Sequence, residues 1–306
     1  MRKLIRRIAG GKEEENTREG SPENDLPDPE VVGEYREVYL TRATDERIRE
    51  HGQDGGTTTA LLAHALEEDT VEAVIASSTV ETWKPEPVIV TDPDELIETA
   101  GSKYAISPNV SALNEAIASY DSVALVGTPC QITAVKKSKM YPYGLANVTE
   151  RVKLTVGIFC TENFQYESLL KLLEDMGVDV ENVERMDISH GEFIVRTKNG
   201  DVHSVSVSKL GDYANEACNY CTDFTAEDAD ISVGSVGAPD GWNVVLVRTK
   251  EGEKVFRSAV DADVLEVKDI GEGDPNLLER LARDKKERIH TSMCATWRPY
   301  HPTVPL

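Results

Sequence analysis

Residues 121–160 read DSVALVGTPCQITAVKKSKMYPYGLANVTERVKLTVGIFC, and this stretch decides the fold class of the chain. Its two ends, DSVALVGTPC and VKLTVGIFC, contain short apolar runs rich in valine, which are typical of buried strands. The segment QITAVKKSKM between them predicts a helix. A strand, a helix and a second strand in this order indicate a sheet whose neighbouring strands run parallel.

The same alternation continues on both sides of this stretch. Upstream, we predict strands at 36–44, 71–79 and 85–90, a helix after the glycine turn at 55–56, and another over 110–120. Downstream, 163–177 predicts a helix, 187–210 a hairpin turning at Asn199-Gly200, and 243–262 a strand followed by a helix. We therefore predict an α/β fold with a mixed, mostly parallel sheet flanked by helices, and with a hairpin-containing C-terminal part.

Composition excludes several classes of function. The 306 residues carry a formal net charge of −22, from 55 acidic and 33 basic residues. This charge repels nucleic acid, and no basic patch follows the first dozen residues.

The acids are spread along the chain, which indicates a surface adapted to high salt, as in a halophilic archaeon. No stretch approaches the roughly 18 apolar residues of a membrane span, and MRKLIRRIAGG lacks the apolar core of a secretory signal, so a cytoplasmic protein is expected.

The two ends of the chain differ from the rest. Residues 12–30, KEEENTREGSPENDLPDPE, are highly charged, contain proline and include few large apolar side chains. Such a composition cannot bury a core. We predict a disordered tail over 1–33, basic and then acidic, and an irregular tail over 286–306.

The five cysteines suggest metal or redox chemistry. The sequence shows no export signal, so a framework of disulfide bonds is not expected. Cys130 and Cys160 each follow a predicted strand, at the sheet edge where ligands bind in parallel α/β folds. Cys218 and Cys221 form a C-x-x-C motif. Four thiols can therefore meet at one edge. Spacing alone leaves three interpretations open: an iron–sulfur cluster, a zinc site, or unrelated buried cysteines.

Three glycine-containing loops are candidate cofactor contacts. They are Gly55, Gly56, Thr57, Thr58 and Thr59; Gly101, Ser102, Lys103 and Tyr104; and Gly127, Thr128 and Pro129. The first loop opens a predicted helix, whose free N–H groups can hold a phosphate or the edge of a flavin ring. A glycine turn with a threonine cap explains the same residues. The second loop combines a cation for a phosphate with an aromatic face for stacking, yet it is also consistent with an ordinary loop.

Four segments together carry a family resemblance: AGSKYAISPNVSALNEAI (100–117), VGTPCQITAVKKSKMYPYGLANV (126–148), GIFCTENFQYESLL (157–170) and CNYCTDFTAEDADISVGSVGAPDGWNVVLVRT (218–249). They resemble the beta subunits of coenzyme F420-reducing hydrogenase and of related deazaflavin-linked dehydrogenases. The resemblance covers about 34–285, as an N-terminal part of about 34–125 and a C-terminal part of about 126–285. Residues 1–33 and 286–306 lie outside it.

The resemblance implies an oxidoreductase subunit that contains FAD and a [4Fe–4S] cluster and exchanges hydride or electrons between coenzyme F420 and a redox partner. Carried over by position, Cys130, Cys160, Cys218 and Cys221 become the cluster ligands. The glycine loops become flavin or deazaflavin contacts, without an assignment of one loop to one cofactor. The glycines of 234–241 are interpreted as backbone slim enough to pass close to the cluster or a ring. Cys294 is predicted to be a free thiol.

Two other functions remain open at this level. One is a reductase of the same family with a different acceptor, such as a tetrapyrrole. The other is a non-catalytic assembly subunit whose fold is held together by a bound metal. We assign no catalytic proton-transfer residue, and we expect a protein redox partner of unknown identity.

Overall fold

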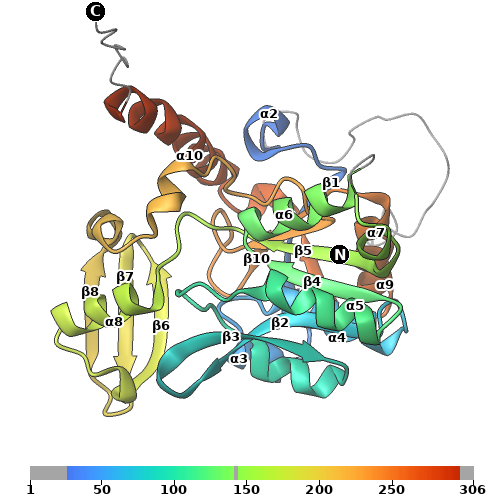
Figure 1. Cartoon of the computed structure of the whole chain (residues 1–306), viewed down its shortest axis with the longest axis horizontal. Coiled ribbons are helices and arrows are strands. Elements are labelled where there is room, and N and C mark those ends of the chain that lie inside the picture. Colours follow the sequence, from blue (N-terminus) through green and yellow to red (C-terminus); the bar gives the residue numbers. More distant parts are fainter. Residues whose placement is uncertain (1–25, 141–143, 297–306) are drawn as a thin grey trace, which may run out of the picture.

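The structure, a computed structural model, describes residues 26–140 and 144–296, with the side chains of all these residues except Glu81 and 289–296. In this part of the chain, one large sheet has the strand order β11-β1-β10-β9-β5-β4-β2-β3 (Figure 1). Its strands are β1 (Glu37–Ala43), β2 (Ala73–Val80), β3 (Lys84–Val90), β4 (Val123–Gly127), β5 (Val152–Ile158), β9 (Ile231–Gly234), β10 (Asn243–Val247) and β11 (Leu265–Lys268). The central strands β9-β5-β4-β2 are parallel, whereas the flanking pairs are antiparallel. The predicted mixed α/β sheet is confirmed.

The stretch 121–160 forms the predicted strand, helix and strand. β4 and β5 pair in parallel, and α6 (Pro129–Lys139) and α7 (Ala146–Arg151) connect them. Successive side chains of a strand point to opposite faces of the sheet. Accordingly, Val123 and Leu125 pack on α5, α6 and α7, whereas Ala124 faces the opposite core. This central unit is therefore buried on both faces, which explains its apolar sequence.

Helices cover both faces of the large sheet. They are α3 (Glu46–His51), α4 (Thr57–Glu67), α5 (Leu113–Ser119), α6, α7 and α9 (Lys250–Asp261). α4 and α9 pack on one face, where Leu61, Leu62 and Phe256 are fully buried. α5, α6 and α7 cover the other face around Ile117, Ile132 and the strand residue Ile75. None of the helices in the described residues is long and apolar enough to cross a bilayer.

A second, smaller sheet lies beside the large one, at the left in Figure 1. It contains β6 (Val183–Ser189), β7 (Glu192–Thr197) and β8 (Val202–Ser206), all antiparallel, with α8 (Tyr166–Asp175) packed against it. The chain turns between β7 and β8 at Asn199-Gly200, where Gly200 has a φ of 87° that favours glycine. The predicted hairpin is thus confirmed, and β6 adds a third strand to it.

Short 3₁₀ segments connect many of these elements. They are η1 (Glu81–Trp83), η2 (Pro93–Thr99), η3 (Asn109–Ala112), η4 (Val180–Asn182), η5 (Val207–Asp212), η6 (Glu216–Tyr220) and η7 (Ile270–Glu272). The large sheet draws strands from both predicted parts of the chain: β1 lies between β10 and β11. The two parts are therefore interleaved in one sheet.

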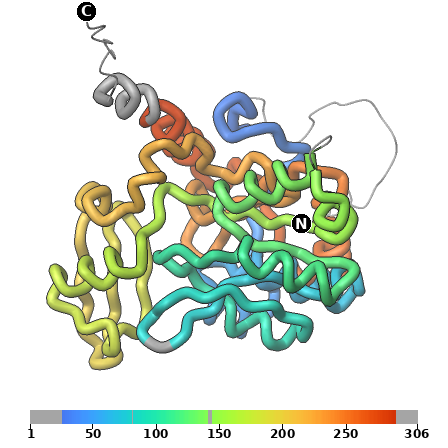
Figure 2. Tube along the Cα trace, viewed as in Figure 1, coloured from blue at the N-terminus to red at the C-terminus, as the bar shows by residue number. Residues whose placement is uncertain are grey.

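The ends of the chain require two corrections. The predicted disordered tail 1–33 reaches too far, because α2 (Pro29–Val32) is a helix whose Val31 and Val32 are buried. The predicted irregular tail 286–306 also begins too early, because α10 (Pro275–Thr296) continues through its first residues and lies beside α2 (Figure 2). A few apolar side chains meeting across the fold order both segments, and average composition does not reveal such contacts. Residues 1–25 and 297–306 lie outside the described part.

Candidate functional site

The predicted loops gather at one edge of the large sheet. β4, β5 and β9 end there, and the antiparallel β10 begins there, since Val244 is paired with Gly234 and Asn243 with Thr41. Ligands of parallel α/β sheets bind outside the carboxyl ends of the strands. This edge therefore contains the candidate site.

The four predicted cysteines come from three separate loops at this edge. Cys130 lies in the first turn of α6 directly after β4, and Cys160 follows β5. Cys218 lies in η6, and Cys221 ends that turn. The C-x-x-C segment is held near Cys160 by backbone bonds: Asn215 N donates to Asn163 O at 2.8 Å, and Cys160 N donates to Phe224 O at 2.9 Å. These bonds join segments that lie more than 50 residues apart.

The four thiols are close enough for their charges to influence one another's pKa values. Burial is the largest reason that the pKa of the Cys160 thiol rises to about 12; the charge of Lys285 opposes the rise, and the other three thiols add to it. Burial likewise raises the pKa of Cys218, with Cys221 and Cys130 contributing and Lys285 again opposing. Cys130, Cys160, Cys218 and Cys221 thus lie near enough to influence one another's pKa values at this edge, and their role as ligands stays a prediction.

The spacing of these thiols differs from that of a closed zinc site. In the described residues, no three side chains of Cys, His, Asp or Glu are near enough to hold one metal ion. A structural zinc ion needs four ligands at about 2.0–2.3 Å, whereas an iron–sulfur cluster is a larger body whose ligands are farther apart. The donor set, four thiols with no imidazole, occurs in structural zinc sites as well as in iron–sulfur clusters. The side chain of Cys294 is outside the described part of the chain.

Polar residues fix the loop that carries Cys130. Thr128 and Gln131 form a reciprocal cap on α6, with Thr128 N donating to Gln131 Oε1 at 3.0 Å. The Gln131 amide also donates to Ser107 O at 2.5 Å, and Asn109 Nδ2 donates to Val126 O at 2.8 Å. The N–H of Thr128, in a loop predicted to contact a cofactor, is therefore used inside the protein. Thr128 Oγ1 lies 3.3 Å from Cys130 Sγ.

The predicted glycine turn at 55–59 opens α4 as expected. Gly56 has a φ of 70° and is the N-cap, so the cap residue itself has no capping side chain, while Thr57 N donates to Asn243 Oδ1 at 3.4 Å. A Cβ on Gly55 would lie 2.7 Å from Asn243 Oδ1, and one on Gly56 would lie 2.8 Å from Ile48 Cγ2. Thr57 is buried, with its Oγ1 2.9 Å from Thr41 Oγ1. The protein's own packing thus requires both glycines, and of the three threonines only Thr58 is partly exposed.

The loop of Gly101 to Tyr104 differs from the prediction in two respects. Lys103 Nζ donates to the backbone oxygens of Thr99 (2.6 Å), Ala100 (2.5 Å) and Gly101 (3.0 Å). A phosphate would have to compete with these three carbonyls for the ammonium. Tyr104 packs edge-on against Phe193 at 5.2 Å between ring centroids, so its ring already joins the core of the small sheet.

A polar cluster that sequence reasoning missed joins the two loops to the small sheet. Arg185 on β6 donates to Gly52 O (3.1 Å) and Gln53 O (2.9 Å) and pairs with Asp187 (3.1 Å). The Gln53 side chain donates to Asp187 and accepts from Ser102 N. Because these residues form no motif in the sequence, only their spatial arrangement reveals them. The cluster holds the glycine turn and the 101–104 loop in one relative position.

The glycines of 234–241 also serve the protein's own packing. A Cβ on Gly234 would lie within 2.1–2.6 Å of Phe159, whose ring packs on Phe224 at 5.5 Å. A Cβ on Gly237 would lie 2.9 Å from Asp274 O, whereas Gly241 has open space around it. At Gly234 and Gly237 the close neighbours are protein atoms, and an approach of this run to a cluster or a ring stays a prediction.

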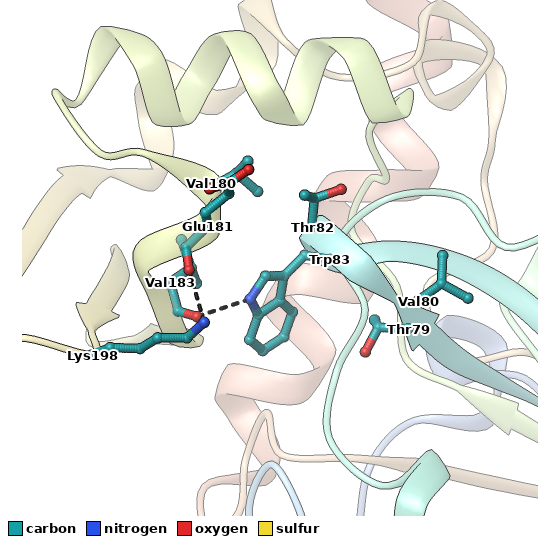
Figure 3. Close-up of a pocket in the computed structure, with 8 residues that line it drawn as sticks. All are labelled: Thr79, Val80, Thr82, Trp83, Val180, Glu181, Val183 and Lys198. Carbon is teal, nitrogen blue, oxygen red and sulfur yellow. Dashed lines mark hydrogen bonds between the residues drawn. The ribbon is translucent and has the colours of Figure 1, made fainter.

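A cavity of about 350 Å³ lies between the turn after β2 and the small sheet (Figure 3). Its lining is Thr79, Val80, Thr82, Trp83, Val180, Glu181, Val183 and Lys198. Trp83 Nε1 donates to Val183 O at 3.1 Å and Lys198 Nζ donates to Glu181 O at 2.8 Å, so these two polar groups are satisfied by the protein. Of the cysteines whose side chains the structure describes, none lines this cavity.

Comparison with known proteins gives a consistent result. Two sequence models match the chain: the N-terminal domain of the coenzyme F420 hydrogenase/dehydrogenase beta subunit over 38–114, and its C-terminal domain over 120–273. The coenzyme F420 hydrogenase subunit beta of Methanothermobacter thermautotrophicus is 42% identical over 271 residues, which is 87% of this chain and 96% of the relative. The F420-dependent formate dehydrogenase subunit beta of Methanocaldococcus jannaschii is 27% identical over 79% of this chain and 64% of the relative.

One solved structure extends the similarity to the fold. A chain of the F420-reducing [NiFe] hydrogenase complex from Methanosarcina barkeri superposes with a TM-score of 0.84 at 36% identity. The match covers 88% of this chain and 94% of that chain. The two chains thus share their fold over most of their length.

Proposed function

The chain belongs to the family of coenzyme F420 hydrogenase/dehydrogenase beta subunits, and we propose that it is an F420-dependent oxidoreductase subunit that exchanges electrons between coenzyme F420 and a protein redox partner. The relatives support F420 as the shared substrate, since a hydrogenase subunit and a dehydrogenase subunit both carry it in their names. Both are also subunits, which supports a partner protein. We place the reaction in the cytoplasm.

Two resident groups would connect the substrate to the partner. A deazaflavin transfers two electrons as hydride, an iron–sulfur cluster passes one, and FAD does both, which is the chemistry these groups supply when bound. The chain's own task is to hold the three in sequence and to keep water away from the hydride. The edge of the large sheet, where the cysteine loops and glycine loops meet, is where we propose that this occurs.

The observation that carries the cluster proposal is the mutual interaction of four thiols from three loops. We propose that Cys130, Cys160, Cys218 and Cys221 hold a [4Fe–4S] cluster. Buried thiols with raised pKa values are poor anions unless a metal takes the proton's place. Iron binding would therefore release protons and stabilise the folded edge at the same time.

The glycine turn and the 101–104 loop are the proposed flavin or deazaflavin contacts. The support is the first turn of α4 at this edge, whose N-cap Gly56 has no capping side chain, because the N-terminus of a helix attracts phosphate. Arg185 and Gln53 fix the turn by hydrogen bonds to backbone and side chain. Residues 55–59, 101–104 and 127–129 stay predictions as ligand contacts, and for Lys103 a contact would require release of its three carbonyls.

Cofactor content tests this function directly. Anaerobically purified protein should be yellow-brown, with flavin absorption bands on a broad cluster shoulder, and should contain iron, acid-labile sulfide and FAD. A colourless protein that contains zinc would refute the oxidoreductase and favour a metal-stapled assembly subunit. A protein with both groups that reduces a tetrapyrrole but not F420 would move the chain to a different acceptor.

A further inference from the structure

Helix α10 carries a lysine where its apolar stripe predicts a hydrophobic residue. Leu278, Ala282 and Lys285 follow one another at spacings of four and three and so lie on one face of the helix. Their exposed fractions are 0%, 1% and 2%. Lysine is almost never fully buried unless it is paired. A buried lysine at this position therefore calls for a partner.

The position of Lys285 shows where that partner lies. Its ammonium donates to the backbone oxygen of Cys160, and α10 packs on η6, the turn that carries Cys218. The neighbouring Lys286 and Arg288 form ion pairs with Glu227 (2.9 Å) and Glu162 (3.3 Å). No such carboxylate pairs with Lys285 anywhere in residues 26–140 or 144–296. Its ammonium lies instead against the loop of Cys160, beside the four-cysteine site.

We propose that Lys285 is the internal countercharge of the four-cysteine site, which it holds at a higher reduction potential than the thiolates alone would give. This inference rests on the proposed cluster. Four thiolates and a cluster concentrate negative charge in a buried site, and each added electron increases it. A fixed positive charge nearby favours the more negative, reduced state.

The match between this chain and the family's C-terminal domain ends at residue 273, so Lys285 lies outside the matched region. We assign Lys285 a positioning and tuning role: it acts on the site through charge and through the Cys160 carbonyl.

Two variants separate charge from shape. In Lys285→Gln a hydrogen-bond donor remains but the charge is lost, whereas Lys285→Arg keeps the charge. Lys286→Gln is the matched control, because Lys286 is the next residue and its charge is paired with Glu227 at the surface. The full-length protein and each variant are purified anaerobically, analysed for iron and sulfide, and titrated with dithionite while the reduced cluster is followed by electron paramagnetic resonance.

We expect Lys285→Gln to disfavour one-electron reduction at least tenfold, a fall of 59 mV or more in midpoint potential. Lys285→Arg and Lys286→Gln should stay close to the unmodified protein. Loss of iron from Lys285→Gln but not from Lys285→Arg would also support the countercharge. An iron-loaded Lys285→Gln with an unchanged midpoint would overturn it, and so would loss of iron from both Lys285 variants. If the unmodified protein binds no iron, the proposed function fails instead.

Discussion

Gly234→Ala tests how the fold holds the cysteine loop. Gly234 ends β9, and an added Cβ would lie 2.1 Å from Phe159 Cδ2, 2.3 Å from Cγ and 2.6 Å from Cβ. The Cβ of Phe159 is bonded to its Cα, so this atom cannot move aside without moving the backbone. Phe159 directly precedes Cys160, and Phe159 N donates to Val233 O at 2.9 Å. The substitution should therefore displace Cys160 as well as the ring.

The size of the effect follows from two opposing terms. Overpacking of a tight core costs about 1–3 kcal/mol, whereas replacing a strand glycine by alanine returns about 0.5–1 kcal/mol of backbone entropy. Gly234 does not have a positive φ, so alanine at this position adds no strain to the backbone conformation. The free energy of unfolding should fall by about 1–2 kcal/mol. Iron content should also fall, because one ligand is displaced.

Denaturant unfolding and iron analysis measure both effects on the same preparations. Gly211→Ala is the control, since a Cβ there meets nothing within 4 Å and φ is not positive. That control should change neither stability nor iron by much. A Gly234→Ala protein that is as stable as the unmodified one and fully loaded with iron would refute the packing argument.

Three further predictions concern the cysteines and the surface. Serine at position 130, 160, 218 or 221 should strip most of the iron measured per chain, whereas Cys294→Ser should leave it unchanged; iron loss from Cys294→Ser alone would mean that the ligand set is wrong. In the iron-free chain, iodoacetamide should label the exposed Cys130 long before Cys160. The rate of Cys160 labelling should rise about tenfold per pH unit below the pKa of that thiol, which is about 12. Peptide mass spectrometry that finds Cys160 labelled first at pH 8 would contradict the burial of that thiol. Because the net charge is −22 and the screening length falls from about 10 Å at 0.1 M salt to about 3 Å at 1 M, the melting temperature should rise with KCl over that range; a fall would contradict salt adaptation.

Local sequence patterns were sufficient to predict the buried strands and the tight turn, because these elements are determined by residues close together in the sequence. The apolar runs around Leu125 and Val156 are buried on both faces of the sheet, so their sequence identifies them as central strands. The hairpin at Asn199-Gly200 follows from turn chemistry. Cys130 and Cys160 could be expected to meet because they follow neighbouring parallel strands.

The remaining features depend on contacts between distant segments. The C-x-x-C reaches Cys160 through the bridge between Phe164 and Ala214, which no spacing rule predicts. Lys103 turns to the carbonyls of its own loop, and Arg185 binds the backbone of Gly52 and Gln53 from another sheet. Such hydrogen bonds are decided by the packed fold. They explain why loop positions were predictable while side-chain partners were not.

Stopped-flow mixing of the anaerobic protein with reduced coenzyme F420 tests the central claim most directly. We expect the flavin absorption to bleach at substrate concentrations of F420, followed by a slower loss of the cluster shoulder as electrons move from flavin to iron. A protein that contains flavin and iron but shows no bleaching with reduced F420 would contradict its assignment as an F420-dependent oxidoreductase.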